Sequence, residues 1–251
     1  MSRKRVIVTG NTGIAAALIR TLHERGDSIY VIGGTDEASE LLAKSYTNIL
    51  GFYSADLRKE DDCVNAFAKA TKALGSVSDV VGIVGGSGRT FGDGRFDEIP
   101  LSGWDATLEL NLSTAFLTLR EGLRVLIANG GSITLTSSVL ATSPVFESFT
   151  THAYATSKYA IEGMVKLAAK SFIDKKIRIN AVAPGLVTTP MSKRATDDPM
   201  IQNFIKQKQP LSLGQLDPDN LIPTYLYLID NSQVTGEILT LDGGWRSVTR
   251  L

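Results

Sequence analysis

The stretch VIVTGNTGIAA, residues 6–16, decides the fold of this chain. Its first four residues are all β-branched, which is typical of a strand buried on both faces, and an amphipathic pattern predicts a helix from Ile14 onward. A G-x-x-G-x-x-A spacing joins the two elements. Gly10 permits a tight turn, Gly13 lets the backbone approach a pyrophosphate, and Ala16 keeps helix and strand close. The free N–H groups of that helix would point at the phosphates.

The rest of the chain repeats this strand–turn–helix pattern. Many glycine turns bind no ligand, so the turn alone does not establish a dinucleotide site. Short β-branched runs that alternate with amphipathic stretches favour such a site, because they predict βαβ units around a parallel sheet. We therefore expect an α/β fold, with a single doubly wound, Rossmann-like domain over residues 1–251. The predicted strands span residues 6–9, 29–32, 49–53, 80–84, 132–136, 178–182 and 238–241, and the predicted helices span residues 14–25, 37–45, 62–74, 102–128, 154–174 and 220–230.

Residues 191–218 form the least regular part of the pattern, because Pro, Asp, Gln and Lys accumulate there. Two interpretations stay open for this segment. It is either a loose connector or a mobile flap over the edge of the sheet at which ligands bind.

Composition narrows the class of protein. The 251 residues include 43% hydrophobic and 21% charged residues, which is ordinary for a globular protein. Basic and acidic residues both number 26, so no excess of positive charge favours nucleic acid or an anionic membrane. We expect neither a secretion signal nor a membrane span, since no apolar run is long enough. The one cysteine, Cys63, predicts no internal disulfide and no metal site, and it fits a cytoplasmic protein.

The end of the second predicted strand bears on the choice of cofactor. An acidic residue there would bind the ribose of NAD and repel the phosphate of NADP. The chain instead has Gly33, Gly34 and Thr35, which favours NADP through space for its phosphate and through the Thr35 hydroxyl. Asp36 is compatible with two roles, a ribose ligand that would reverse this preference or the N-cap of the next helix.

Several polar side chains are predicted to gather at the same edge of the sheet. Tyr154 and Lys158 lie one turn apart on a helix, and a nearby ammonium draws the pKa of a phenol down toward neutral pH. The strand at 132–136 leads into two serines, of which one can hydrogen-bond a substrate carbonyl. Asn111 interrupts an apolar helical stretch, either as a satisfied core amide or as a residue that bends its helix and holds a water.

Taken together, these motifs resemble the short-chain dehydrogenase/reductase family over almost the whole chain. The residues that carry the resemblance are Thr9-Gly10-x-x-Gly13, Asp56-Leu57, Asn111, Ser138, Tyr154-x-x-x-Lys158, Asn180-Ala181-Val182-Ala183-Pro184-Gly185, Thr189-Pro190-Met191 and Asp242-Gly243-Gly244. The resemblance implies a seven-stranded parallel sheet flanked by helices. It also implies reversible NAD(P)-dependent reduction of a ketone or aldehyde to an alcohol, and a homotetramer or other homo-oligomer in which the helices at 102–128 and 154–174 pair.

The resemblance also implies site roles. Tyr154 would be the acid/base, Ser138 would polarise the carbonyl, Lys158 would bind ribose and lower the pKa of the tyrosine, and Asn111 would hold a water of the proton relay. The expected cofactor contacts are Gly10, Asn11, Thr12, Gly13, Ile14, Thr35, Asp56, Leu57, Gly85, Tyr154, Lys158, Pro184, Gly185, Val187 and Thr189.

The chain departs from the family pattern at two motifs. Its glycine turn is one residue shorter and ends in Gly13-Ile14-Ala15 rather than Gly-Ile-Gly. The usual Asn-Asn-Ala-Gly after the fourth strand is replaced by Ile83-Val84-Gly85-Gly86, which removes amides that brace the sheet. Both changes bear on cofactor affinity more than on chemistry.

Two loops near the predicted site have open roles. Phe146 and Phe149 either line the substrate entrance or pack beneath a loop or at a subunit contact. The arginines of residues 88–95 either attract an anionic substrate or are solvated surface charges, and we favour the second.

The altered motifs leave room for other functions. One alternative is a cofactor-sensing regulator without turnover. The presence of all four residues of the catalytic tetrad, Asn111, Ser138, Tyr154 and Lys158, argues against it. An epimerase or dehydratase is another, although the chain looks too short for it.

Overall fold

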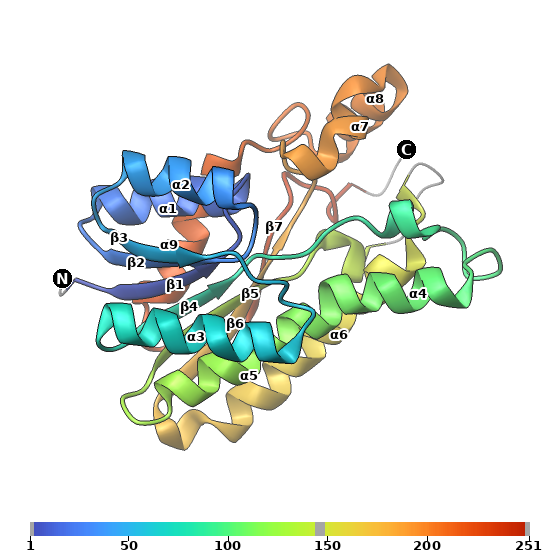
Figure 1. Cartoon of the computed structure of the whole chain (residues 1–251). Coiled ribbons are helices and arrows are strands. Elements are labelled where there is room, and N and C mark those ends of the chain that lie inside the picture. Colours follow the sequence, from blue (N-terminus) through green and yellow to red (C-terminus); the bar gives the residue numbers. More distant parts are fainter. Residues whose placement is uncertain (1–2, 144–148, 249–251) are drawn as a thin grey trace.

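A single parallel sheet forms the centre of the molecule (Figure 1). The computed structural model describes residues 3–143 and 149–248. Its seven strands pair in the order β3-β2-β1-β4-β5-β6-β7, and every pair is parallel. The strands are β1 (Arg5–Thr9), β2 (Ser28–Ile32), β3 (Ile49–Tyr53), β4 (Asp79–Gly82), β5 (Gly131–Thr136), β6 (Ile177–Pro184) and β7 (Ile238–Leu241). This order confirms the expected Rossmann-like fold, and all seven predicted strands are present.

Helices cover both faces of the sheet, α1, α2 and α9 on one face and α3, α5 and α6 on the other (Figure 1). The helices are α1 (Ile14–Glu24), α2 (Asp36–Ser45), α3 (Glu60–Leu74), α4 (Leu101–Leu108), α5 (Thr114–Leu126), α6 (His152–Ser171), α7 (Lys193–Asp197), α8 (Pro199–Lys208) and α9 (Ile222–Asp230). Within the described ranges, no helix is both long enough and apolar enough to cross a bilayer.

The strands are apolar on both faces because each face has its own core. Val6 and Val8 pack with Leu18 of α1, whereas Ile7 between them packs with Phe67 of α3. This alternation follows from the two-residue period of a strand. The sheet is therefore fixed between two helix layers, and its carboxyl edge is held in place for a site.

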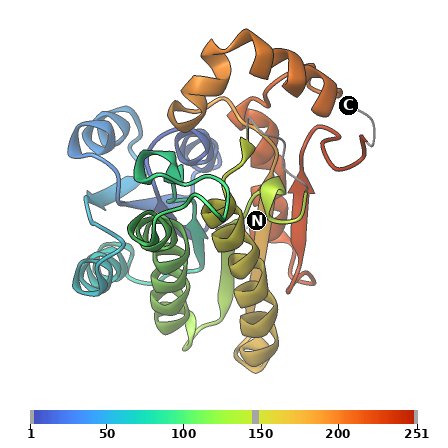
Figure 2. The ribbon, with the colours of Figure 1, turned by 90° about the vertical axis from the view of Figure 1, so that its right-hand side faces the viewer.

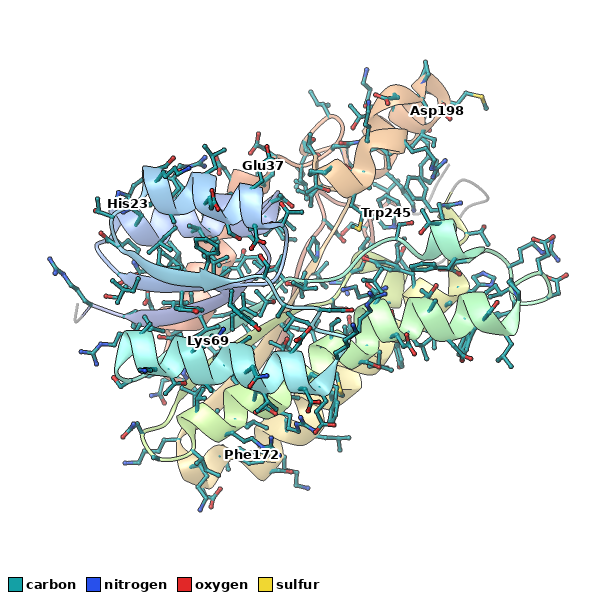
Figure 3. The ribbon with its side chains drawn as sticks, in the orientation of Figure 1. His23, Glu37, Lys69, Phe172, Asp198 and Trp245 are labelled. Carbon is teal, nitrogen blue, oxygen red and sulfur yellow. The ribbon has the colours of Figure 1, made fainter. Side chains whose placement is uncertain are left out.

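Of the two interpretations for residues 191–218, the loose connector is wrong, since the segment contains helices α7 and α8. The Asp198 carboxylate accepts hydrogen bonds from the N–H groups of Met200 and Ile201, so it caps α8, and Pro199 occupies the first helical position. Ile201 and Ile205 then lie one turn apart and pack into a third core cluster with Trp245. Figure 2 shows these helices apart from the layers that cover the sheet, and Asp198 is labelled in Figure 3. The N-cap and the buried apolar side chains thus make this segment helical, although its composition is typical of a loop.

The predicted helix at 102–128 is also interrupted. A π-helical turn, Glu109–Ser113, separates α4 from α5 and is centred on Asn111. Such turns widen the hydrogen-bond ladder by one residue and are frequent at functional sites.

Thr9 ties the first strand to the segment that follows β4. Its hydroxyl oxygen accepts hydrogen bonds from the N–H groups of Ile83 (3.0 Å) and Val84 (3.3 Å). The strand order reverses between β1 and β4, and ligands of doubly wound sheets bind outside the carboxyl ends at such a point. Thr9 therefore braces the edge on which a site would form.

Replacing Thr9 tests this brace. Thr9→Val keeps the shape of the side chain but leaves two backbone N–H groups without their acceptor, which costs about 1–3 kcal/mol for each group that stays unsatisfied. We expect a lower free energy of unfolding in urea, whereas Thr9→Ser keeps the hydroxyl and loses much less. A loss in Thr9→Ser with none in Thr9→Val would show that packing of the methyl group, and not the brace, matters.

Candidate active site

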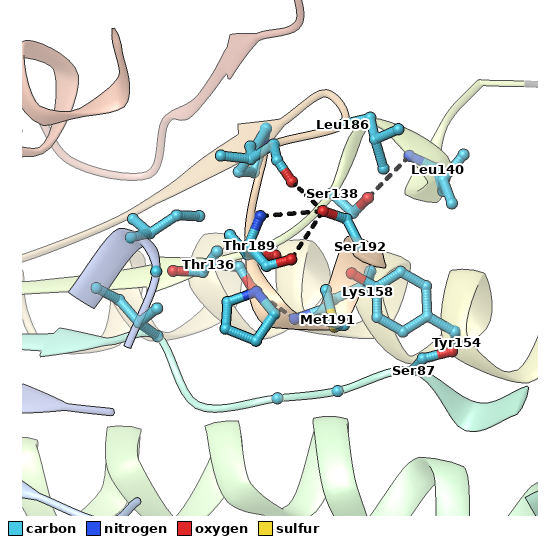
Figure 4. A pocket seen from close by; sticks show the side chains of 18 of the residues that line it. Ser87, Thr136, Ser138, Leu140, Tyr154, Lys158, Leu186, Thr189, Met191 and Ser192 are labelled. Atoms are coloured by element: carbon cyan, nitrogen blue, oxygen red, sulfur yellow. Dashed lines mark hydrogen bonds between the residues drawn. The ribbon is translucent and has the colours of Figure 1, made fainter. Parts of the chain in front are cut away.

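A cavity of about 590 Å³ lies at the carboxyl ends of the strands. Its wall combines the turn after β1, the segment after β4, the end of β5, the start of α6 and the loop after β6 (Figure 4). The predicted site residues on this wall are Gly10, Asn11, Thr12, Gly13, Ile14, Gly85, Ser138, Tyr154, Lys158, Pro184, Gly185, Val187 and Thr189. The wall does not include Thr35, Asp56, Leu57 or Asn111. Most of the predicted residues thus meet around one space.

The glycine turn has the backbone expected of a phosphate site. Gly10 (φ 96°) and Gly13 (φ 55°) both adopt a conformation that L side chains rarely take. Gly13 is the N-cap of α1, where no side chain caps the helix and no acid occupies the first turn, so the positive end of the helix faces the cavity without a competing anion. The buried alanine nearest Gly10 is Ala15, whose Cβ would lie 3.3 Å from a Cβ at Gly10. Ala15 rather than Ala16 therefore keeps strand and helix close.

The side chains expected at the adenosine end are engaged elsewhere. The Thr35 hydroxyl caps α2 by accepting from the N–H of Ala38, so Thr35, not Asp36, is the helix cap. Asp36 accepts a hydrogen bond from the Ser54 hydroxyl. Asp56 forms a bidentate pair with Arg58, which holds the pKa of this carboxyl below its usual range. Leu57 is buried in the core.

Asn111 is a satisfied amide within the helix that it bends. Its Nδ2 donates to the carbonyl oxygens of Gly86 and Thr107, both at 3.0 Å, and its Oδ1 accepts from the N–H of Gly86 at 3.1 Å. Thr9 and Asn111 thus hold the segment that lacks the family's amides. A Cβ at Gly85 would lie 2.9 Å from Asn111 Oδ1 and 3.4 Å from Lys158 Nζ, which explains the glycine there.

Tyr154 and Lys158 come from the first turns of α6 and line the cavity, Lys158 buried and Tyr154 half-buried. The ammonium of Lys158 donates to the carbonyl oxygen of Thr136 at 2.9 Å and lies 5.5 Å from the centre of the Tyr154 ring. Ser138 lies close enough to Tyr154 to lower the pKa of its phenol, and its oxygen accepts from the N–H of Leu140. The hydroxyl, phenol and ammonium groups predicted to act together are therefore adjacent.

The titration of these groups differs from the expectation. Burial raises the pKa of Tyr154 to about 12, although the neighbouring Ser138 side chain opposes the shift. Burial also lowers the pKa of Lys158 to about 8. In this protein the loss of hydration outweighs the influence of Ser138 on the phenol, so Tyr154 is protonated at neutral pH.

Sequence reasoning missed Asp93, which fixes the start of α6. Its carboxylate accepts from the N–H of Ala153 (2.9 Å) and from the N–H of Tyr154 (3.0 Å). Asp93 lies far from α6 in the sequence, so no local capping pattern signals this contact. Ser192 was missed as well, and its hydroxyl accepts from the N–H of Thr189 in the loop after β6. Here a signal existed, because Thr189, Pro190 and Ser192 have the spacing of a capping box.

The structure decides part of the alternatives that the sequence left open for two loops near the site. Phe149 lines the cavity and also stacks on Phe204 beside Trp245, so both of its interpretations hold, and Phe146 lies outside the described residues. Arg95 is an exposed partner of Asp97, as favoured. Arg89 lines the cavity, so the surface interpretation is wrong for it.

Comparison with known proteins agrees with this architecture. A family model described as Enoyl-(Acyl carrier protein) reductase matches residues 8–246. The chain belongs to the short-chain dehydrogenase/reductase family and is an NAD(P)-dependent oxidoreductase that acts on CH–OH and C=O groups.

Named relatives span the chain from end to end. It is 30% identical to carbonyl reductase family member 4 of Danio rerio, over 97% of this chain and 98% of that protein. It is 27% identical to xanthoxin dehydrogenase of Arabidopsis thaliana, over 98% of this chain and 90% of that protein. Among solved structures, ElxO with NADP bound superposes with a TM-score of 0.87 at 25% identity, covering 98% of this chain and all of that one.

Gly13 gives a test of the phosphate end. A Cβ there would lie 2.9 Å from Thr189 Cγ2, so Gly13→Ala forces the turn and the loop after β6 apart. We expect binding of NADPH, followed by its fluorescence, to weaken by at least about tenfold, or ~1.4 kcal/mol.

Two variants serve as controls for Gly13→Ala. Gly75 also has positive φ (70°) but nothing lies within 4 Å of its Cβ position, so Gly75→Ala should cost stability without changing cofactor affinity. Thr189→Ser removes the nearest methyl group and should restore part of the lost affinity. No restoration in the double variant would show that strain at Gly13, and not the contact, causes the loss.

Proposed function

We propose that this chain reduces a ketone or aldehyde to an alcohol, and catalyses the reverse reaction, with Tyr154 as the acid/base. One observation carries the proposal. The side chains of Ser138 and Tyr154 lie close enough for Ser138 to lower the pKa of the phenol, and both line the cavity that extends to the glycine turn. The substrate and the reactive end of a dinucleotide would share this space.

Each member of the tetrad has a task that its surroundings support. The nicotinamide cofactor, when bound, supplies the hydride to the carbonyl carbon or takes it from the alcohol carbon. Tyr154 gives its proton to the carbonyl oxygen, and a phenol that is protonated at neutral pH is ready for this step. Ser138 donates a hydrogen bond to the same oxygen. In the oxidation, Tyr154 would have to lose its proton first, so its environment favours reduction.

Lys158 acts through its charge. Its ammonium, held by the Thr136 carbonyl, favours the phenolate that forms when Tyr154 gives up its proton, and it would donate to ribose hydroxyls of the cofactor. Asn111 has both Nδ2 hydrogens in use, so we propose that it supports a relay water through the placement of the helix and of Gly86.

The cavity wall fits a dinucleotide. Gly10, Asn11, Thr12, Gly13 and Ile14 would hold the pyrophosphate, and Gly85, Pro184, Gly185, Val187 and Thr189 would contact the remainder. Thr35, Asp56 and Leu57 do not line the cavity, and we propose that they contact the cofactor just outside its edge. We propose NADP as the preferred cofactor, because the acid nearest the end of β2, Asp36, is bonded to Ser54, and Gly34 beside it is exposed and has no side chain.

Assembly and location remain proposals. We propose one domain that forms a homo-oligomer, a tetramer or a dimer, through α5 and α6, whose outer faces expose Phe116, Tyr159 and Leu167. We propose a cytoplasmic location, because the one cysteine, Cys63, is buried with its pKa raised to about 12 and thus stays an unreactive thiol.

Removing the phenolic hydroxyl tests the reaction. Tyr154→Phe should lower the turnover of assorted ketones and aldehydes by about 10²–10⁴-fold, the usual contribution of general acid catalysis, while the affinity for NADPH stays within a few-fold of wild type. Oxidation of NADPH and of NADH is followed at 340 nm, and NADPH should give the faster turnover. Unchanged turnover in the variant would refute the role of Tyr154. Cofactor binding without turnover of any carbonyl by the wild-type protein would instead favour a cofactor-sensing regulator.

The pH dependence tests Lys158. Its pKa is lowered to about 8, so the ammonium exists below that pH and is lost as the pH rises through it, whereas Tyr154 stays protonated to higher pH. We expect kcat/KM for reduction to be level around pH 6–7 and to fall as the pH rises past about 8. Lys158→Met should give low activity without this alkaline limb. A wild-type profile that stays level to pH 10 would contradict the assignment.

A further inference from the structure

Two arginines lie on the cavity wall outside the tetrad and the glycine turn. Arg89 belongs to the short 3₁₀ helix Gly88–Phe91 that follows β4, and Arg194 lies in α7. Arg89 is half-buried, and its pKa is lowered first by burial and then by the positive charge of Arg194. Two segments remote in the sequence therefore bring two guanidinium groups within electrostatic reach of each other at one cavity.

Both arginines stand on a fixed backbone. The Ser87 hydroxyl accepts from the N–H of Arg89 and caps its turn, and a Cβ at the buried Gly88 would lie 2.4 Å from Thr107 Oγ1 of α4, so this turn is packed directly on α4. On the other side, Ser192 anchors the start of α7 through hydrogen bonds with Val187 and Thr189. A binding group on such supports needs little ordering when a ligand arrives.

Asp93, an acid near Arg89, is committed to the main chain. The negative charge of Asp93 attracts the Arg89 guanidinium. Both carboxylate oxygens of Asp93, however, accept from N–H groups at the start of α6, and this side chain is only 6% exposed. Apolar side chains make up much of the surrounding wall, namely Leu140, Phe149, Leu186, Met191 and Trp245. This part of the cavity thus combines two guanidinium groups with an apolar lining.

We propose that the substrate is an oxo acid, reduced to the corresponding hydroxy acid, whose carboxylate is held by Arg89 and Arg194. Guanidinium groups bind carboxylates through paired, charge-assisted hydrogen bonds. The carbon chain between the carboxylate and the reacting carbonyl lies against the apolar lining, and the carbonyl oxygen reaches Tyr154 and Ser138. This assignment of the substrate class rests on the proposed function of the same cavity.

Equilibrium binding tests the assignment without turnover. The Tyr154→Phe protein, saturated with NADP⁺, is titrated by calorimetry with linear oxo acids of increasing chain length and with their methyl esters. The best acid should bind at least about tenfold more tightly than its ester, as expected for hydrogen bonds to a charged group. Adding Arg89→Gln or Arg194→Gln should remove this preference. Adding Arg95→Gln is the matched control, because Arg95 lies in the same loop but pairs with Asp97 at the surface, and it should keep the preference.

Three results would overturn the assignment. The esters bind as tightly as the acids; no acid binds; or the acid-to-ester ratio is the same with and without the two arginines. The affinity for NADP⁺ is measured in the same variants, because a loss confined to the cofactor would assign the guanidinium groups to its phosphates instead. Turnover by the protein with Tyr154 intact separates the two proposals. Reduction of carbonyl compounds without a preference for acids would refute only the proposed substrate class. Preferential binding of acids without any reduction would refute only the proposed reaction.

Discussion

The site depends on one constraint: the side chains of Thr9 and Asn111 fix the backbone of the segment after β4 by hydrogen bonds. Thr9 accepts from the N–H groups of Ile83 and Val84, and Asn111 bonds the peptide groups of Gly86 in both directions. Between these anchors Gly85 passes Asn111 and Lys158 without room for a side chain. The floor of the cavity is therefore bare backbone, stretched between β1 on one side and the π-helical turn on the other. If either anchor moved, both the cofactor side and the catalytic side would move with it.

Burial sets the chemistry on that floor. Taking Tyr154 and Lys158 out of water disfavours the charged form of each, so the pair rests as a neutral phenol beside an ammonium that is easily deprotonated. The phenolate and the ammonium stabilise each other only once the proton has left the ring. Under the proposed function, this attraction would therefore act in the reacting state rather than in the resting state, which is the condition for an interaction to accelerate a reaction.

Most of the architecture was predictable because it follows from periodicity. Seven strands and the helices that cover the sheet came from β-branched runs and amphipathic patterns, and the site followed from where those strands end. Ser192 had the local signal of a capping box, but two other misses share a cause. Helix α8 depends on the burial of Ile201 and Ile205 against Trp245, and Asp93 reaches the start of α6 across about sixty residues of chain. Contacts of this kind depend on the tertiary structure, and no local pattern encodes them. The same holds for the pKa of Tyr154, which burial decides and spacing does not.

The close approach of Gly13 to Thr189 has a consequence for how ligands enter. It brings the turn after β1 against the loop that leads into α7, and both segments belong to the cavity wall. A ligand that entered between these two segments would push them apart. Such a displacement would reach α7 and α8, whose buried side chains pack with Phe149 and Trp245. Under the proposed function, a dinucleotide at the turn after β1 and a substrate beside Phe149 and Trp245 would therefore influence each other through this contact.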